Sequence, residues 1–220
     1  MRGLPETADL VGEDLACRRG GRLVFEALEF RLSAGGAVLL TGPNGSGKSS
    51  LLRLLAALLT PAAGRLLWGG IPVEDDPAAF RAMIHYVGHL DGVKPALSPR
   101  EMLGFWSALR GVQRPAIDRA LAAFGMDRIA DWPCRWLSAG QKRRLALARL
   151  IAAPAPLWLL DEPAAALDDD GEARLAAAIE SHRAAGGRVV AATHQPMAVA
   201  DAATLSIDAF AAPIDDSLLV

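Results

Sequence analysis

The feature that most constrains this chain is a glycine-rich motif near residue 45. It is Gly-Pro-Asn-Gly-Ser-Gly-Lys-Ser over residues 42–49 and fits G-x-x-x-x-G-K-[ST], the pattern of a phosphate-binding P-loop. The apolar run 37–40 predicts a buried strand before it, and the run 50–58 predicts a helix after it. Glycines let the backbone approach phosphate oxygens, and N–H groups at a helix N-terminus face an anion. We therefore expect a strand–loop–helix unit that binds phosphate.

The side chains of this motif divide the binding between them. Lys48 is expected to reach the β- and γ-phosphates of a nucleotide, and the Ser49 hydroxyl is expected to ligate Mg²⁺. A glycine-rich turn that only joins a strand to a helix is the alternative, but it does not require Lys-Ser at this offset. The remaining expected nucleotide contacts are Gly42, Pro43, Asn44, Gly45, Ser46, Gly47 and Ser50.

Composition limits the function classes. A net charge of −2 over 220 residues argues against bulk nucleic-acid binding, which needs a basic field. Although 52% of the residues are hydrophobic, the longest uncharged apolar run, 150–160, contains two prolines and is too short to span a bilayer. Residues 1–6 lack the apolar segment of a signal peptide, and Cys17 and Cys134 have no metal-site spacing, so we expect free thiols. The chain is predicted to be cytosolic, with an apolar surplus suited to docking on a membrane protein.

The order of the elements predicts an α/β fold. Residues 9–32, with a turn at Gly20-Gly21, suggest an antiparallel β-subdomain, and residues 98–137 show only helical periodicity. Elsewhere strands and helices alternate, which implies a mostly parallel sheet core covered on both faces. Further strands are expected at 65–68, 84–87, 157–160, 188–193 and 204–207, and helices at 141–152, 171–184, 196–202 and, capped by Asp76, through Arg81.

An acidic pair follows one of the buried strands. Asp161 and Glu162 come directly after the apolar run 157–160, and ligands bind at this end of the strands in open parallel sheets. Asp161 is expected to hold Mg²⁺, which takes one or two carboxylates together with phosphate oxygens. Glu162 is expected to polarise the water that attacks the γ-phosphate, a task typically worth ~10²–10⁴-fold in rate. An acidic turn that merely ends a strand is the alternative, and the P-loop upstream argues against it.

Further motifs complete an ordered set. Leu-Ser-Ala-Gly-Gln at 137–141 precedes a helix, Ala-Leu-Asp at 166–168 follows the acidic pair, and His194 follows a strand. With the P-loop and the acidic pair, this order resembles the nucleotide-binding subunits of ABC transporters over residues 9–207.

The resemblance implies a fold, an activity and a domain division. It implies an ABC-type ATPase in which Glu162, His194 and Lys48 are catalytic, with His194 contacting the γ-phosphate and supporting Glu162. It also implies one domain over 1–220: a core lobe with the β-subdomain (1–87 and 141–207), a helical signature subdomain (88–140) and a tail (208–220). Two copies would form a head-to-tail dimer that holds two ATP molecules, each contacted in trans by Ser138, Gly140, Gln141 and Asp168.

Two positions depart from the family pattern. His89 stands where most members have a glutamine that touches Mg²⁺ or the attacking water, and a neutral imidazole can ligate a metal or donate a hydrogen bond. The aromatic residue that usually stacks on adenine is replaced by Arg18 or Arg19. A guanidinium plane can stack on a base, so Arg19 is either an adenine contact or a solvent-facing arginine.

One branch of the family shares these features. The segments 88–103, 137–150 and 193–196 are similar to the ATPase subunits of the haem exporter complex of bacterial cytochrome c maturation. That branch implies ATP hydrolysis at the cytoplasmic face of the inner membrane, coupled to haem export or to release of a haem-loaded chaperone. The implied partners are a CcmB-type membrane subunit, with CcmC-type and small accessory subunits. The alternative is the ATPase subunit of another small-molecule ABC transporter.

The surface that meets the membrane subunit is expected near the helical insert. His89 begins a loop to Pro99, and Phe105 and Trp106 lie on the helix that follows, so both aromatics are either anchors of this interface or core residues. His182 is expected on a solvated helix face. DNA-repair, ribosome-associated and non-catalytic relatives are disfavoured, because the chain lacks long heptad repeats and a second cassette and keeps its catalytic residues.

Overall fold

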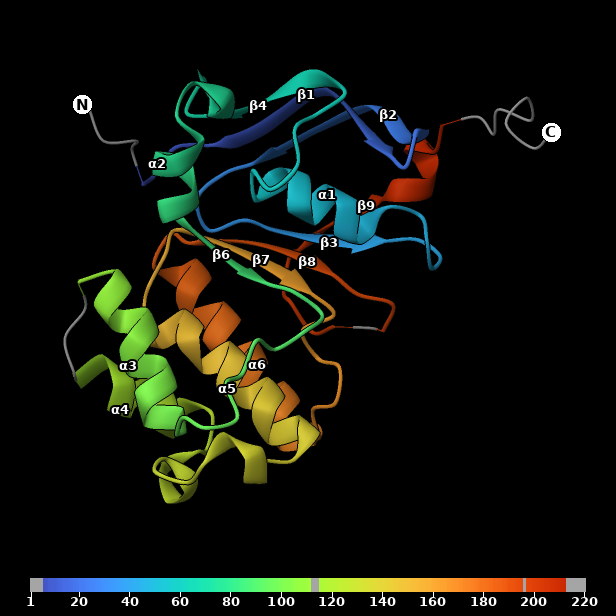
Figure 1. The fold of residues 1–220 in the computed structure, drawn as a ribbon. Helices are drawn as coiled ribbons and strands as arrows, with labels where there is room; N and C mark the ends of the chain where they lie inside the picture. The colour runs from blue at the N-terminus through green and yellow to red at the C-terminus, as the bar shows by residue number, and fades with distance from the viewer. Residues whose placement is uncertain (1–5, 112–114, 196, 213–220) are drawn as a thin grey trace.

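Two sheets form the half of the molecule that carries the glycine-rich loop (Figure 1). The computed structural model describes residues 6–111, 115–195 and 197–212. The first sheet is antiparallel, in the order β2-β1-β4-β5, and the second is parallel, in the order β6-β7-β8-β3-β9. The strands of the first sheet are β1 (Leu10–Arg19), β2 (Arg22–Leu32), β4 (Ala63–Trp68) and β5 (Ile71–Pro72). Those of the second are β3 (Ala37–Thr41), β6 (Ile84–Val87), β7 (Leu157–Asp161), β8 (Arg188–Ala192) and β9 (Ala203–Ser206).

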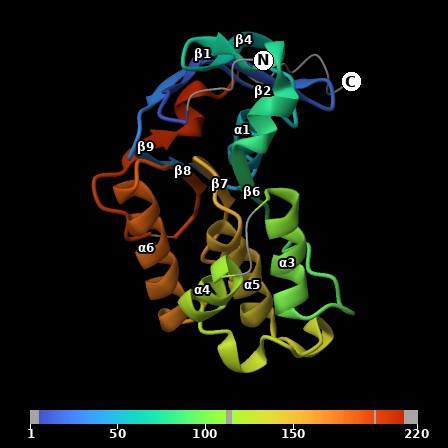
Figure 2. The ribbon, with the colours of Figure 1, turned by 90° about the vertical axis from the view of Figure 1, so that its left-hand side faces the viewer.

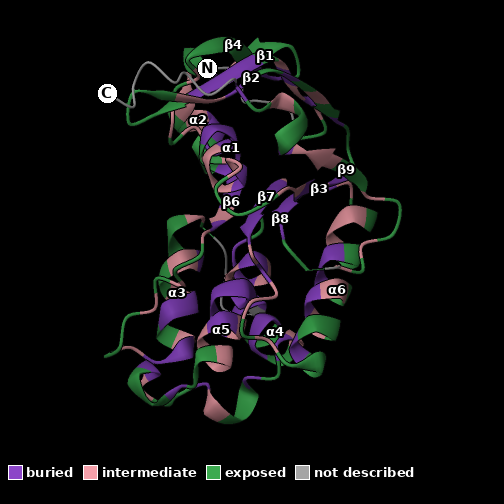
Figure 3. Ribbon diagram, turned by 90° about the vertical axis from the view of Figure 1, so that its right-hand side faces the viewer, coloured by how far each residue is buried: buried purple, intermediate pink, exposed green. Residues whose placement is uncertain are grey.

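The parallel sheet lies between two hydrophobic cores. Helix α1 (Lys48–Leu55) separates it from the antiparallel sheet, and helices α5 (Ala139–Ala152) and α6 (Asp169–Ala184) cover its other face (Figures 1 and 2). Every residue of β7 and β8 is buried, as Figure 3 shows. Strands covered on both faces need continuous apolar runs, which is why these segments do not alternate between apolar and polar residues.

The helical insert packs on α5. Helices α3 (Pro99–Leu109) and α4 (Pro115–Ala123) contact each other and α5, and a buried cluster joins them to the parallel sheet. Helix α5 therefore crosses the division predicted between residues 140 and 141. Shorter helical elements are α2 (Pro77–Ala82) and the 3₁₀ turns Val73–Asp75, Asp127–Ile129, Cys134–Trp136 and Ile207–Phe210.

Side chains cap the helices that position the functional residues. Ser138 and Gln141 form a capping box at the start of α5, and Asp168 accepts a hydrogen bond from the Gly171 N–H at the start of α6. Asp76 caps α2, as the sequence predicted. Each cap satisfies a backbone N–H that the helix leaves unpaired, and so fixes where the helix begins.

Three expectations differ from the structure. Residues 197–202 form no helix, and Pro196 lies outside the described residues. His182 does not face solvent, because its ring stacks on the Trp158 ring with centroids 3.8 Å apart. The helix after the glycine-rich loop ends at Leu55 rather than continuing to residue 58.

The remaining expectations concern the chain end, the thiols and the membrane. In the predicted tail, Ala212 is buried and Ala211 forms a bridge with Phe25, whereas residues 213–220 lie outside the described residues. Cys17 and Cys134 are buried free thiols. Within the described ranges, no helix has the length and apolar character needed to cross a membrane.

Candidate active site

The glycine-rich loop joins β3 to α1 with its backbone in conformations that favour glycine. Gly42, Gly45 and Gly47 have φ angles of 133°, 83° and 108°. Among the described residues no side chain caps α1 at Gly47, and its first turn contains no acidic residue. Its first N–H groups and the positive end of its dipole therefore favour an anion.

The side chains of the loop, like its backbone, indicate an anion-binding site. Lys48 is buried, and its Nζ donates hydrogen bonds to the carbonyls of Gly42 (2.6 Å) and Pro43 (3.0 Å), which directs the ammonium group over the loop. The Ser46 hydroxyl oxygen is buried without a hydrogen-bond partner among the described residues. A buried polar atom of this kind needs a partner, and the described residues supply none.

A hydroxyl group and a carboxylate meet where α1 begins and β7 ends. The Ser49 hydroxyl lies 3.1 Å from Oδ1 of Asp161, although the two residues are 112 positions apart in the chain. Asp161 is buried at the carboxyl end of β7. A hydroxyl and a carboxylate oxygen together fit Mg²⁺, which takes hard oxygen ligands and completes its octahedron with water and phosphate.

Glu162 and His194 form a hydrogen-bonded pair beside these ligands. His194 Nδ1 lies 2.7 Å from Glu162 Oε2, and the Glu162 side chain is mostly buried whereas that of His194 is mostly exposed. Glu162 has a φ of 48°, which is rare for a residue with a side chain and costs about 1–3 kcal/mol. Strain of this kind persists where the surrounding structure holds it.

One cavity brings these residues together. Its volume is about 560 Å³, which is large enough for a nucleotide. Arg19 lines it and Arg18 does not, because the Arg18 guanidinium donates to the Gly21 carbonyl in the hairpin turn (2.9 Å). Val24, which no sequence motif marks, also lines the cavity. The predicted residues in the lining are Arg19, Asn44, Gly45, Gly47, Lys48, Ser49, Ser50, His89, Asp161, Glu162 and His194.

The residues expected to act in trans line a different cavity. Ser138, Gly140, Gln141 and Asp168 surround a hollow of about 460 Å³ at the N-terminal ends of α5 and α6. None of the described residues lines both this cavity and the first one. Each cavity therefore contains one part of the predicted site.

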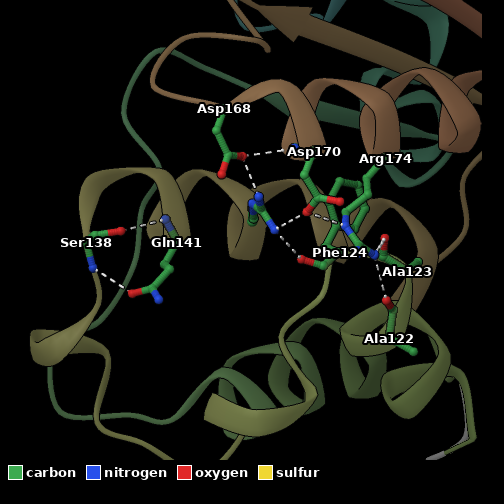
Figure 4. Close-up of polar contacts among 10 residues, drawn as sticks. Ala122, Ala123, Phe124, Ser138, Gln141, Asp168, Asp170 and Arg174 are labelled. Carbon is green, nitrogen blue, oxygen red and sulfur yellow. Dashed lines mark hydrogen bonds and ion pairs between the residues drawn. The ribbon is translucent and has the colours of Figure 1, made fainter.

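Ion pairs hold the second cavity together (Figure 4). Arg144 pairs with Asp168 and with Asp170 (2.9 Å), and Asp170 also pairs with Arg174 (2.8 Å). The hydrogen bond from Arg144 is the main reason that the pKa of Asp168 lies below its usual value. Arg174 donates to the last carbonyls of α4, those of Ala122 (3.2 Å) and Ala123 (3.1 Å). The sequence analysis gave these arginines no role, although they follow the Leu-Ser-Ala-Gly-Gln motif and the Ala-Leu-Asp motif closely.

A third hollow lies between α1, β6 and α3. Trp106 lines it and Phe105 contacts Trp106 edge to face, with ring centroids 5.6 Å apart. Phe105 is 55% exposed, so it is not a core residue. The Arg149 guanidinium lies over the Trp106 ring at 5.1 Å, and burial lowers the pKa of Arg149 to about 10.

Comparison with known proteins identifies relatives for nearly the whole chain. A family model described as "ABC transporter" matches residues 25–165. The "Cytochrome c biogenesis ATP-binding export protein CcmA" of Rhodospirillum rubrum is 59% identical over 95% of this chain and 90% of the relative. The protein of the same name from Paramagnetospirillum magneticum is 54% identical over 90% of this chain and 94% of the relative.

Solved structures share the fold. A putative ABC transporter ATP-binding protein from Pyrococcus furiosus superimposes with a TM-score of 0.82 at 23% identity, over 93% of this chain and all of that one. A bacterial Atm1-family ABC exporter with ATP bound has a TM-score of 0.80 at 23% identity, over 91% of this chain and 37% of the exporter chain. At this level of identity the likeness establishes the fold alone.

Proposed function

This chain belongs to the ABC transporter family and is an ABC-type ATPase of a cytochrome c biogenesis export system, and from that premise we propose how its residues hydrolyse ATP and what the hydrolysis drives. The observation that carries the proposal is the hydrogen bond between His194 and Glu162, 2.7 Å long, in the same cavity as the P-loop. ATP binds there with its phosphates on the loop, against Lys48 and the N-terminus of α1.

Glu162 acts as the general base of the reaction. Water attacks the γ-phosphorus while its proton passes to the Glu162 carboxylate, and the bond from the phosphorus to the bridging oxygen breaks with its electrons on ADP. His194 donates its Nδ1 hydrogen to Glu162 Oε2 and so holds the carboxylate in one orientation. Lys48 neutralises charge on the β- and γ-phosphates. Ser49 and Asp161 would hold Mg²⁺, which would supply positive charge to the phosphate oxygens.

His89 and Arg19, the two residues that differ from the family pattern, also have roles at this site. His89 lines the cavity, within the loop that follows β6. Its ring would contact the metal or the attacking water. Arg19 lines the cavity from the end of β1, and its guanidinium plane stacks on the adenine.

Two copies of the chain complete each ATP site. The hollow lined by Ser138, Gly140, Gln141 and Asp168 is separate from the P-loop cavity. This separation supports a head-to-tail dimer in which the P-loop cavity of one copy faces this hollow of the second copy. The first turn of α5 has no acidic residue, so its N-terminus favours the phosphates of an ATP held by the second copy. ATP binding then closes the dimer and hydrolysis opens it.

The membrane subunit docks in the hollow lined by Trp106. The hollow has a volume of about 220 Å³, is basic through Arg81, Arg110 and Arg149, and has no acidic residue among the described residues that line it. The Nε atom of Arg149 is buried there without a partner among the described residues. An apolar segment with an acidic side chain, or the C-terminal end of a helix, would complement this charge.

The process that ATP hydrolysis drives is inferred from the export system to which the ATPase belongs. We propose that hydrolysis at the cytoplasmic face of the bacterial inner membrane drives haem export or release of a haem-loaded chaperone. The membrane partner is of the CcmB type, with CcmC-type and small accessory subunits. The names of the relatives, which are export proteins of cytochrome c biogenesis, support this cargo over that of another small-molecule transporter.

Replacing Glu162 by Gln tests the proposal. The amide keeps the shape of the side chain but cannot accept the proton, so hydrolysis should fall by roughly 10²–10⁴-fold while ATP still binds. In the native host we expect c-type cytochromes to disappear, measured by staining for covalently bound haem, while the variant protein accumulates.

Glu180→Gln is the matched control, because Glu180 is exposed on α6 away from the cavity. It should leave hydrolysis and cytochrome content unchanged. Wild-type levels of c-type cytochromes in Glu162→Gln cells would refute the assignment to haem handling.

A further inference from the structure

Arg143 is a buried charge for which the sequence analysis found no role. It lies in the first half of α5, and its side chain is only 3% exposed. A buried guanidinium must pair all its N–H groups and balance its charge, because an unpaired buried charge is very costly. The hydrogen-bond partners of Arg143 therefore show which segments it holds in place.

Three partners are consecutive carbonyls, of the last residue of β7 and the two residues after it. The Nε atom donates to Pro163 (3.1 Å), and one terminal nitrogen donates to both Asp161 (2.8 Å) and Glu162 (2.6 Å). Glu162 has a left-handed backbone with a φ of 48°, which is held only if its surroundings enforce it. The planar guanidinium fork fixes these carbonyls together, and so fixes the direction in which the Glu162 side chain leaves the backbone.

The other partners belong to the loop after β6. The second terminal nitrogen donates to the Gly88 carbonyl (3.0 Å) and to Oδ1 of Asp91 (3.0 Å). These two residues flank His89, which lines the nucleotide cavity. The Asp91 side chain is 25% exposed, so the carboxylate that balances the buried charge lies at the edge of the structure. All five N–H donors of the guanidinium are then used.

One side chain thus connects the loops that follow the neighbouring strands β6 and β7, and both loops line the nucleotide cavity. If the loop at 88–91 moves, Gly88 and Asp91 move with it, and the rigid fork must tilt or give up hydrogen bonds to the carbonyls at 161–163. In either case the Glu162 carboxylate changes its direction. A misplacement of about 1 Å in a catalytic group can cost about a hundredfold in rate.

We propose that Arg143 is a positioning residue that holds Glu162 in its reactive orientation and makes that orientation depend on the loop Gly88–Asp91. The loop carries His89 and continues toward α3, which begins at Pro99 and bears Trp106 of the docking hollow. Movement of the loop is therefore transmitted to the general base through hydrogen bonds. The inference rests on the role proposed above for Glu162.

Conservative substitutions of Arg143 and of Asp91, which form the ion pair between α5 and the loop, test this proposal. Arg143→Lys keeps the charge but cannot bridge five acceptors, and Asp91→Asn keeps the loop but removes the counter-charge. On the purified full chain we expect Arg143→Lys to lower kcat about ten- to hundredfold and Asp91→Asn to lower it severalfold, each with the KM for ATP unchanged. The double variant should be no slower than Arg143→Lys, because both changes break one connection.

An ion pair elsewhere provides the matched control. Arg100 lies 2.5 Å from Asp118, away from both ATP-site cavities, and Arg100→Lys and Asp118→Asn should leave kcat unchanged. Wild-type kcat in Asp91→Asn and Arg143→Lys, together with lowered unfolding temperatures, would reduce Arg143 to a structural role and overturn the proposal. If Arg143→Lys does not fold, a wild-type kcat in Asp91→Asn overturns it. A Glu162→Gln variant assayed alongside shows separately whether Glu162 is the base.

Discussion

His182 lies on α6, but its side chain packs against another ring instead of lying on a solvated helix face. Its ring lies parallel to that of Trp158, with an interplanar angle of 2°, and its Nε2 hydrogen is donated to the Arg188 carbonyl (3.3 Å). A Cβ atom on Gly187 would lie 2.1 Å from the imidazole, so glycine there makes room for the ring. Burial lowers the pKa of His182 to about 4, and the imidazole is therefore neutral at physiological pH.

A neutral buried histidine makes stability depend on pH. Below about pH 6.5 the unfolded chain binds a proton that folded His182 does not bind, so the free energy of unfolding falls as the pH drops from 6.5 toward 4. His182→Phe keeps a ring against Trp158 but removes this proton. We expect the loss of unfolding free energy between pH 7 and pH 5 to be smaller in the variant by at most about 2 kcal/mol.

Urea unfolding at the two pH values measures this difference. His85, whose pKa burial lowers to about 3, is present in both proteins and cancels from the comparison. Equal pH dependence in the variant and the wild-type protein would contradict the assigned state of His182.

At the scale of elements, the start of α5 is placed by close backbone contact. The capping box of Ser138 and Gln141 fixes where the helix begins, and Arg144 ties the helix to the N-cap of α6 through Asp168. A Cβ on Gly140 would lie 2.8 Å from the Ala166 carbonyl oxygen, which is closer than real contacts allow. Gly140 is thus needed for the first turn of α5 to approach the loop at 166–168.

Gly140→Ala should therefore disturb the surface proposed to meet the second copy. Overpacking against a backbone atom costs about 1–3 kcal/mol, and relief requires the helix start and the loop to separate. In a Glu162→Gln background, which retains ATP, we expect Gly140→Ala to weaken ATP-dependent dimerisation about tenfold, measured by light scattering.

Gly104→Ala in the same background is the control. A Cβ there would meet Ile117 at 3.8 Å, an ordinary contact, and Gly104 lies inside α3, so alanine should stabilise the helix by about 0.5–1 kcal/mol. Dimerisation should be unaffected. Unchanged dimerisation in the Gly140→Ala protein would argue against the head-to-tail arrangement.

At the scale of the whole molecule, three hollows lie on different parts of the surface. The P-loop cavity lies between the sheets and the loops after β6, β7 and β8, the second lies at the ends of α5 and α6, and the third lies between α1, β6 and α3. The separate hollows would let one chain contact nucleotide, the proposed second copy and the membrane subunit at once. Arg143 and the loop Gly88–Asp91 connect the first of these regions with the approach to the third.

Trp106→Ala tests the third region. An aromatic side chain in a docking hollow commonly contributes about 2 kcal/mol or more to binding. We expect the variant to lose co-purification with the membrane subunit, measured by affinity capture from detergent-solubilised membranes, while its unfolding temperature shows that the chain is folded.

Trp132→Ala is the matched control, because Trp132 is 50% exposed and lies outside all three hollows. It should co-purify as the wild-type chain does. Retained co-purification in the Trp106→Ala protein would show that the membrane subunit docks elsewhere.

Sequence alone determined those features that local chemistry dictates. The P-loop, the acidic pair after an apolar strand and the order of the motifs were sufficient for the α/β fold and the ATPase family, and both are confirmed. These features are visible because each requires particular residue types at fixed spacing in one short segment. Strand ends such as Ile84–Val87 were also predicted from their bounding residues.

Only the tertiary structure decided contacts between segments far apart in the chain. The Ser49–Asp161 pair spans 112 positions, Arg143 reaches two loops, and His182 is neutral because Trp158 covers it. No local pattern marks such partners, since an arginine or histidine on a helix has the same neighbours in sequence whether it faces water or a carbonyl group. Burial and hydrogen-bond geometry, which fix the charge and direction of a side chain, exist only once the sheets and helices have packed together.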